Sequence, residues 1–284
     1  MSPIPSSSSF PPTDEGTFLS EDGLRLAWFR WDQAGAPRGT VCLAHGHGEH
    51  AGRYHHVARA FVRAGFVFLA FDWRGHGRSE GTRGHSPSLG IMLDDVGRLL
   101  ALAPARPRVA YGHSTGGLLV LLRALTEPAG IQGVIATSPW LRLSFPAPAF
   151  KVLMGRMLKG ILPAMTAATG LEQAALSHDP AVVAAYGADP LVHERMSFRL
   201  GIDLLNGGEW ALAHAAEFRL PILLMHGEAD RITDPAATRE FFEKASSADK
   251  TLRLWPGLYH ETHNELEWEK VIEGSTGWAL AHTA

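Results

Sequence analysis

Short apolar runs alternate with longer amphipathic stretches over most of the chain, and this alternation predicts the secondary structure. Apolar runs of strand length lie at residues 40–44, 66–71, 108–111, 133–137 and 220–225, and a last strand is predicted at 250–255. Stretches of helical length lie at residues 54–64, 87–103, 116–126, 235–246 and 264–281. Strands that alternate with helices are typical of a parallel sheet covered by helices on both faces. We therefore expect an α/β fold built on a mostly parallel, doubly wound sheet.

The pattern differs at the N-terminal end and in one long internal segment. Residues 17–20 and 24–31 alternate in polarity around a Glu-Asp-Gly turn, which predicts an N-terminal β-hairpin. Between residues 138 and 217 the alternation of strands and helices stops and Ala, Leu, Met and Pro become frequent. We expect this segment to cover the C-terminal edge of the sheet, where open α/β sheets bind ligands. The domains expected are a flexible tail at 1–16, a core formed by 17–139 and 217–284, and a helical cap at 140–216.

Composition narrows the class of protein. The 284 residues are 45% hydrophobic, enough for a large core, and the formal net charge of −3 gives no basic field for a nucleic-acid partner. Residues 1–12 lack Lys and Arg and contain no apolar run of signal-peptide length, and no stretch of the chain reaches the ~18 apolar residues needed for a membrane span. Cys42 is the only cysteine and lies in an apolar run, which predicts a core thiol, no intrachain disulfide and a cytoplasmic location.

One five-residue motif carries the clearest chemical information. Gly112-His-Ser114-Thr-Gly116 lies where an apolar strand meets an apolar helix, as a nucleophile elbow does. The two glycines remove Cβ atoms from a crowded turn, so Ser114 can adopt a strained conformation with an exposed hydroxyl. Because so short a motif also occurs by chance, the rest of the chain must supply the partners that a serine nucleophile needs.

Those partners are a base and a group that orients the base. In α/β-hydrolases they follow the serine in the order acid then histidine, each just after a later strand. Asp230 follows the strand predicted at 220–225, and His260 follows the strand predicted at 250–255. We therefore expect a catalytic triad of Ser114, Asp230 and His260.

Nearby residues offer alternatives to both partners. Glu228 and Asp234 lie close to Asp230, but Asp234 precedes a proline and fits the N-cap of the next helix. His263 lies three residues after His260 and is expected at the start of the last helix, pointing elsewhere. Without an elbow at the serine, a loop-capping carboxylate and a solvated loop histidine would be the simpler interpretations.

Acyl transfer also needs donors for the oxyanion of the tetrahedral intermediate. One is expected to be the backbone N–H of Thr115, at the N-terminus of the elbow helix. The other is expected to be the backbone N–H of His47, in the turn after the first parallel strand, residues 45–50 (HGHGEH).

The same turn holds residues of ligand type. His45, His47, Glu49 and His50 could in principle bind a metal. The alternating glycines instead favour a turn that needs backbone freedom, and we expect His45, Glu49 and His50 to hold the loop by hydrogen bonds. No metal and no other cofactor is expected.

With these motifs in place, the chain resembles the monoacylglycerol lipase and lysophospholipase branch of the serine α/β-hydrolases. The resemblance rests on HGHGEH at 45–50, GRY at 52–54, FDWRGHGRSEG at 71–81, GHSTGG at 112–117, SP at 138–139, DPL at 189–191 and GEADR at 227–231. It implies an α/β-hydrolase fold, a triad at Ser114, Asp230 and His260, oxyanion donors at His47 and Thr115, and a cap over an acyl pocket. Thr115 and the bulky His47 depart from the residues common in the family, which affects the expected polarity near the scissile carbonyl.

The resemblance makes a serine hydrolase for carboxylic esters with an apolar acyl chain the leading hypothesis, with monoacylglycerol as the substrate and no cofactor. Lysophospholipids, other small esters, thioesters or peptides are the alternative substrates, and a non-catalytic ligand-binding module is a third hypothesis. Arg74 and Arg78 could bind a phosphate but more simply bond neighbouring loops, and residues 189–193 are expected to anchor the cap.

The apolar cap residues leave three placements open. They could line the acyl tunnel, pack on the core, or be exposed for transient contact with a membrane or a second subunit. The residues concerned are Phe145, Phe150, Val152, Leu153, Met154 and Ile161.

Overall fold

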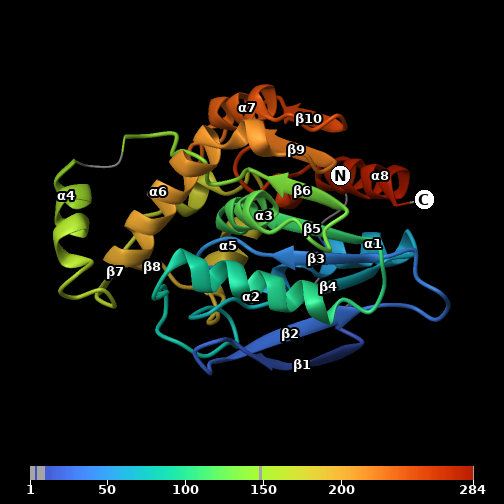
Figure 1. Cartoon of the computed structure of the whole chain (residues 1–284), viewed down its shortest axis with the longest axis horizontal. Helices are drawn as coiled ribbons and strands as arrows, with labels where there is room; N and C mark the ends of the chain where they lie inside the picture. Colours follow the sequence, from blue (N-terminus) through green and yellow to red (C-terminus); the bar gives the residue numbers. More distant parts are fainter. Residues whose placement is uncertain (1–3, 5–9, 147–148, 284) are drawn as a thin grey trace.

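The computed structural model describes residues 4, 10–146 and 149–283, and a sheet of eight strands forms its centre (Figure 1). The strands are β1 (Asp14–Leu19), β2 (Arg25–Trp31), β3 (Thr40–Ala44), β4 (Val67–Phe71), β5 (Arg108–His113), β6 (Gly133–Thr137), β9 (Ile222–Gly227) and β10 (Lys250–Trp255). Their order is β1-β2-β4-β3-β5-β6-β9-β10. Strands β1 and β2 pair antiparallel and β2 joins β4 antiparallel, whereas the other pairs are parallel. The predicted hairpin and mostly parallel sheet are confirmed.

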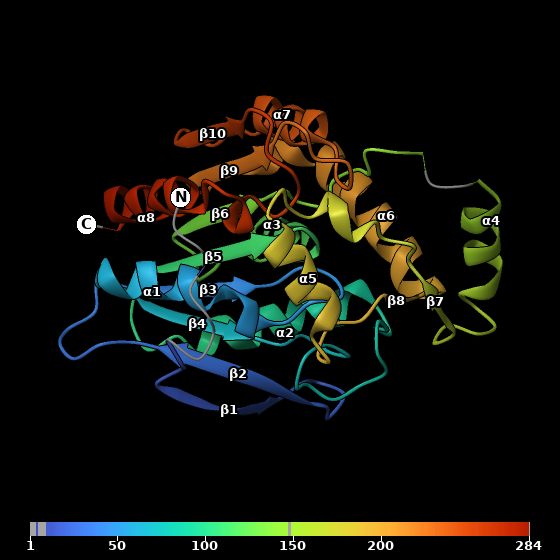
Figure 2. The same ribbon diagram turned by 180° about the vertical axis from the view of Figure 1, so that it is seen from behind.

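Helices cover both faces of the sheet, as the sequence predicted. They are α1 (His55–Arg63), α2 (Leu89–Leu102), α3 (Thr115–Thr126), α7 (Pro235–Lys244) and α8 (Trp268–His282). Helices α1 and α8 lie on one face, and α2, α3 and α7 lie on the other (Figures 1 and 2). Strands β3, β4 and β6 are buried at every position, which explains why their sequences are continuous apolar runs rather than alternating ones.

The insertion between β6 and β9 holds both helices and a small sheet. Its elements are α4 (Ala149–Leu158), β7 (Thr166–Ala168), η3 (Gln173–Ala175), α5 (Pro180–Ala188), β8 (Arg195–Ser197), α6 (Phe198–Ala213) and η4 (Ala215–Glu217). The antiparallel pair of β7 and β8 was not predicted, because each strand has only three residues. Leu200 and Leu204 of α6 are buried in the same apolar cluster as α3, whereas α4 lies at the outer end of the molecule and contacts α6 (Figures 1 and 2).

The N-terminal boundary differs from the expectation. Strand β1 begins at Asp14 and pairs with β2, so residues 14–16, expected in the flexible tail, belong to the sheet. Residues 1–3 and 5–9 of that tail lie outside the described part of the chain. The cap boundaries at 140–216 stay a prediction. Within the described residues, no helix combines the length and the apolar character needed to cross a membrane.

Candidate active site

Ser114 lies in a sharp turn between β5 and α3. Its backbone has φ 53° and ψ −116°, a conformation that costs a non-glycine residue about 1–3 kcal/mol. The flanking glycines are needed for close approach: a Cβ on Gly112 would lie 2.2 Å from the carbonyl oxygen of Gly116, and one on Gly116 would lie 2.0 Å from that of Ala44. The expected elbow geometry is therefore present.

Asp230 and His260 come together after β9 and β10. Nδ1 of His260 lies 2.7 Å from Oδ2 of Asp230, and both side chains are buried. Since β9 and β10 are parallel neighbours, the loops that follow them leave the same edge of the sheet. With Nδ1 bound to the carboxylate, Nε2 is the nitrogen with a free lone pair in the neutral imidazole.

Two residues that sequence reasoning missed hold the Asp230 carboxylate. Nε2 of His226 lies 3.0 Å from Oδ2, and the Thr233 hydroxyl donates to the same oxygen over 2.9 Å. The backbone N–H groups of Ile232 and Thr233 donate to Oδ1 over 2.7 and 3.1 Å. A buried carboxylate needs hydrogen-bond donors on both oxygens. In the sequence, only the closeness of His226 and Thr233 to Asp230 pointed to this role.

These contacts lower the pKa of Asp230 and raise the pKa of His260, as the role of His260 as a base requires. Burial alone would raise the pKa of Asp230, but the charge of His260 and the bond from His226 hold that pKa below its usual value. Burial alone would lower the pKa of His260, but the Asp230 carboxylate outweighs burial and raises that pKa above 6.5. The His260 imidazole is therefore a stronger proton acceptor than a free histidine.

The alternative residues are occupied elsewhere. Asp234 caps α7 by accepting the backbone N–H of Ala236 over 2.8 Å, as expected. The Glu228 carboxylate lies 4.0 Å from Arg239. His263 lies in the short helix η5 (Thr262–Asn264) and stacks on Tyr54, with ring centroids 4.8 Å apart. The structure thus brings Asp230, and none of these carboxylates, to His260.

The residues expected to supply the oxyanion donors, Thr115 and His47, lie near Ser114. Thr115 is the first residue of α3, so its N–H is among those that a helix leaves without an internal partner. The turn after β3 passes against the serine, since a Cβ on Gly46 would lie 3.3 Å from Cβ of Ser114. His47, next in this turn, lines the same cavity as Ser114 and His260. Both donors remain predictions about the reaction.

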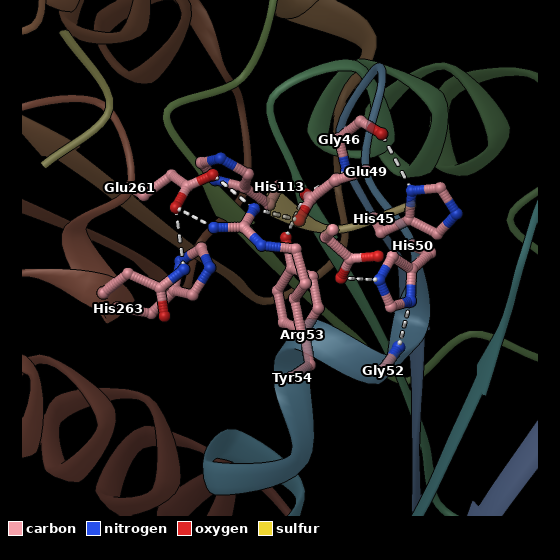
Figure 3. A network of polar contacts seen from close by, with 12 residues as sticks. His45, Gly46, Glu49, His50, Gly52, Arg53, Tyr54, His113, Glu261 and His263 are labelled. Atoms are coloured by element: carbon pink, nitrogen blue, oxygen red, sulfur yellow. Dashed lines mark hydrogen bonds and ion pairs between the residues drawn. The ribbon is translucent and has the colours of Figure 1, made fainter. Parts of the chain in front are cut away.

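A buried charge network connects the turn after β3 with the loop after β10 that carries His260 (Figure 3). Arg53, in the short helix η2 (Ala51–Tyr54), donates to Glu49 over 2.7 Å and makes two bonds to Glu261 over 2.6 and 2.7 Å. Glu49 also accepts the backbone N–H of Gly46 and the hydroxyl of Tyr54, each over 2.7 Å. Because Glu261 follows His260 directly, Arg53 holds together the two loops that carry the predicted oxyanion turn and base.

Hydrogen bonds hold His45 and His50 in the turn at residues 45–50. Nδ1 of His45 lies 2.8 Å from the carbonyl oxygen of Gly46, and Nε2 of His50 lies 2.9 Å from the Asp189 carboxylate. With Glu49 in the charge network, these contacts confirm the structural roles predicted for His45, Glu49 and His50. The contact with Asp189 also confirms that the segment after α5 is anchored to the core.

Arg74 and Arg78 bond neighbouring segments, as expected. Arg74 is buried and contacts Asp22 over 2.8 Å and Asp95 over 2.9 Å. Arg78 pairs with Glu15 over 2.7 Å. Both guanidinium groups are therefore neutralised by carboxylates of this chain.

A cavity of about 580 Å³ lies between the core and the insertion and contains Ser114 and His260 in its wall. Leu171, Leu176, Met196, Ile202 and Leu205 of the insertion also line it. Of the apolar residues whose placement was open, Phe145 and Val152 line the cavity. The others are exposed, namely Phe150, Leu153, Met154 and Ile161.

Fold and site together define a serine hydrolase of the α/β-hydrolase class. A family model described as serine aminopeptidase S33 matches residues 35–267, so the chain belongs to that family. The chain is 36% identical to a monoacylglycerol lipase from Mycolicibacterium smegmatis, over 94% of this chain and 97% of that protein. It also matches the crystal structure of a monoacylglycerol lipase from Paleococcus ferrophilus, with a TM-score of 0.84 and 38% identity over 91% of this chain and 99% of that one.

Another relative is much longer than this chain. The match to an uncharacterized abhydrolase domain-containing protein from Dictyostelium discoideum is 38% identical over 92% of this chain and covers 28% of that protein. Family, fold and relatives make the present chain a serine ester hydrolase, which confirms the enzyme class and the resemblance predicted from the sequence.

Proposed function

We propose that the chain hydrolyses monoacylglycerols through an acyl-enzyme intermediate on Ser114. The proposal rests on the buried hydrogen bond between Asp230 and His260, together with the elbow conformation of Ser114. Ser114 Oγ attacks the ester carbonyl carbon while His260 Nε2 takes its proton, and the N–H groups of His47 and Thr115 donate to the oxyanion. The alcohol then leaves with the proton from His260. A water activated by His260 releases the fatty acid and restores Ser114.

The cavity favours an apolar acyl chain joined to a neutral alcohol. Its walls in the insertion are largely aliphatic, whereas Glu49 and Glu261 line it on the core side, near Ser114. These two carboxylates share one cation, Arg53, so they offer no positive charge to a phosphate in the leaving group. Arg231, which also lines the cavity, lies 3.5 Å from Glu172, and Arg74 and Arg78 are paired elsewhere. Relatives named monoacylglycerol lipases support the same substrate.

The test is hydrolysis of monoacylglycerols of increasing acyl length beside matched lysophosphatidylcholines. We expect kcat/KM to rise with length, by at most about 0.8 kcal/mol for each methylene buried, until the cavity is filled. We expect the glycerol esters to exceed the phospholipids by about tenfold or more. The two carboxylates outnumber their shared cation, and a phosphate that finds no cationic partner there is expected to cost about 1.4 kcal/mol, or tenfold in rate. A preference for lysophosphatidylcholine at every length would contradict the proposed leaving group while leaving the serine mechanism intact.

We also propose that α4 and the turn after it touch the membrane from which the substrate is taken. This segment exposes Phe150, Leu153, Met157 and Ile161 by 62% or more, an unusual density of large apolar side chains on a surface. The segment adjoins the cavity, since Val152 of the same helix lines it. An apolar face of this kind binds at the boundary between headgroups and acyl chains. We propose a cytoplasmic location because Cys42 is the single cysteine of the sequence, so the chain uses no disulfide within itself.

The double substitution Met157→Glu and Ile161→Glu is expected to weaken binding to phosphatidylcholine vesicles by about tenfold or more, because two apolar anchors become charged. Hydrolysis of a soluble p-nitrophenyl ester should be unchanged. Leu19→Glu is the matched control, since Leu19 is 60% exposed on β1, away from the cavity. Equal vesicle binding by the double variant and wild type in a sedimentation assay would refute the membrane contact.

A further inference from the structure

Three histidines from distant parts of the sequence meet where the insertion contacts the core. His47 lies in the loop after β3, His76 in the loop after β4, and His193 between α5 and β8. One ring nitrogen of each lies within 4.8 Å of those of the other two. The ring centroids of His76 and His193 are 4.4 Å apart, and those of His47 and His76 are 5.1 Å apart. This cluster shares only His47 with the ligand set considered from the sequence.

Two nitrogens of the cluster are unused acceptors. His76 is fully buried and directs Nδ1 to the carbonyl oxygen of Arg74 over 3.0 Å, which leaves Nε2 without a hydrogen bond to any described residue. His47 directs Nε2 to the carbonyl oxygen of Arg195 over 2.9 Å, and its buried Nδ1 is likewise unpaired among the described residues. A buried acceptor without a partner costs about 1–3 kcal/mol, so the pair favours a ligand that accepts both lone pairs.

His193 can become a metal ligand beside His47 and His76 if a bond to the metal replaces one of its hydrogen bonds. His193 contacts the carbonyl oxygen of Gly75 through Nε2 over 3.1 Å, and its Nδ1 accepts the N–H of Arg195 over 3.2 Å. Three ligands at a Zn–N distance of ~2.1 Å in a tetrahedral site lie about 3.4 Å apart, so convergence needs shifts of roughly 1 Å. His193 is partly exposed and lies in a loop, where such a shift is easily made.

The ligand chemistry selects the kind of ion. Histidine binds a metal in its neutral form, and burial, which lowers the pKa of all three rings, favours that form. Neutral imidazoles suit Zn²⁺, Ni²⁺, Co²⁺ and Cu²⁺, whereas Mg²⁺ and Ca²⁺ prefer oxygen ligands. We propose that His47, His76 and His193 form a site for one divalent transition-metal ion that ties the insertion to the turn after β3.

The test titrates the metal-free full-length chain with ZnCl₂ by isothermal calorimetry and follows Tm. We expect one Zn²⁺ per chain and a rise in Tm, because an ion that binds only the folded state stabilises it. Co²⁺ should give the visible absorption of a tetrahedral site, and Mg²⁺ and Ca²⁺ should give no binding. Each of His47→Gln and His193→Gln should weaken Zn²⁺ binding by about tenfold or more and reduce the Tm shift at the same Zn²⁺ concentration.

Controls separate this site from other histidines. His282→Gln, which alters a histidine of α8 that pairs with Asp249, should bind Zn²⁺ as wild type does. His260→Gln should also retain binding, and its loss there would place the ion at the base and overturn the proposal. Absence of binding to the wild type, or equal affinity in the His193→Gln variant, would overturn it as well. His193 carries the test because the fully buried His76 affects folding when replaced.

Discussion

Replacing Ser114 by alanine is expected to lower kcat/KM for a soluble p-nitrophenyl ester by about 10⁵-fold, because the acyl-enzyme can no longer form. The fold should survive, since the hydroxyl is not the source of the turn: Gly112 and Gly116 permit it. A fluorophosphonate probe should label the wild type at this serine and leave the alanine variant unlabelled. Full esterase activity in the variant, with unchanged circular dichroism, would refute the mechanism and return the non-catalytic hypothesis to consideration.

Asp230 and its neighbour Asp234 allow a controlled test of which carboxylate is the acid of the triad. Asp230→Asn should lower kcat by about 10⁴-fold, because an amide at this position favours the wrong tautomer of His260. Asp234→Asn should leave kcat/KM within about threefold of wild type, because asparagine caps a helix as well as aspartate does. Equal losses in the two variants would contradict the assignment of Asp230, and would point to damage to the shared loop.

Much of the sheet could be predicted because its central strands are buried on both faces. The strands predicted at 40–44, 133–137 and 250–255 match β3, β6 and β10 residue for residue. In β3 and β6 a buried parallel strand needs apolar side chains at every position, so the pattern marks the strand ends sharply. The pairing of Asp230 with His260 was accessible for a related reason, since each follows a strand directly.

The remaining features depend on contacts between segments far apart in the sequence. His226 and Thr233 gain their importance from the buried carboxylate between them, and the polarity pattern alone could not show that. The pair β7 and β8 is too short to leave a periodic pattern. The two glutamates that Arg53 binds, Glu49 and Glu261, lie near opposite ends of the sequence, so only the fold brings them to one guanidinium group.

Arg53→Met is expected to destabilise the protein by about 3–5 kcal/mol, because it leaves two buried carboxylates without their shared cation. Burial raises the pKa of Glu49, and although burial would do the same to Glu261, Arg53 lowers the pKa of Glu261 to about 2. At neutral pH the variant must therefore protonate both groups or separate them. The free energy of unfolding in urea, measured for Arg53→Met and the wild type, tests this prediction. The same ester assay is applied to the folded fraction of each protein.

Catalysis should fall as well, because the Glu49 carboxylate holds the N–H of Gly46 beside the predicted oxyanion donor and Glu261 adjoins the predicted base. A displacement of about 1 Å at such positions can cost roughly 100-fold in rate. Arg78→Met is the matched control: its ion pair with Glu15 is half exposed and is worth less than about 1 kcal/mol. If the Arg53 and Arg78 variants lost equal stability and kept equal kcat, the network would not hold the loops in place. A loss of kcat in the Arg53 variant, with KM for a soluble ester little changed, would show that the network positions the reacting groups rather than the substrate.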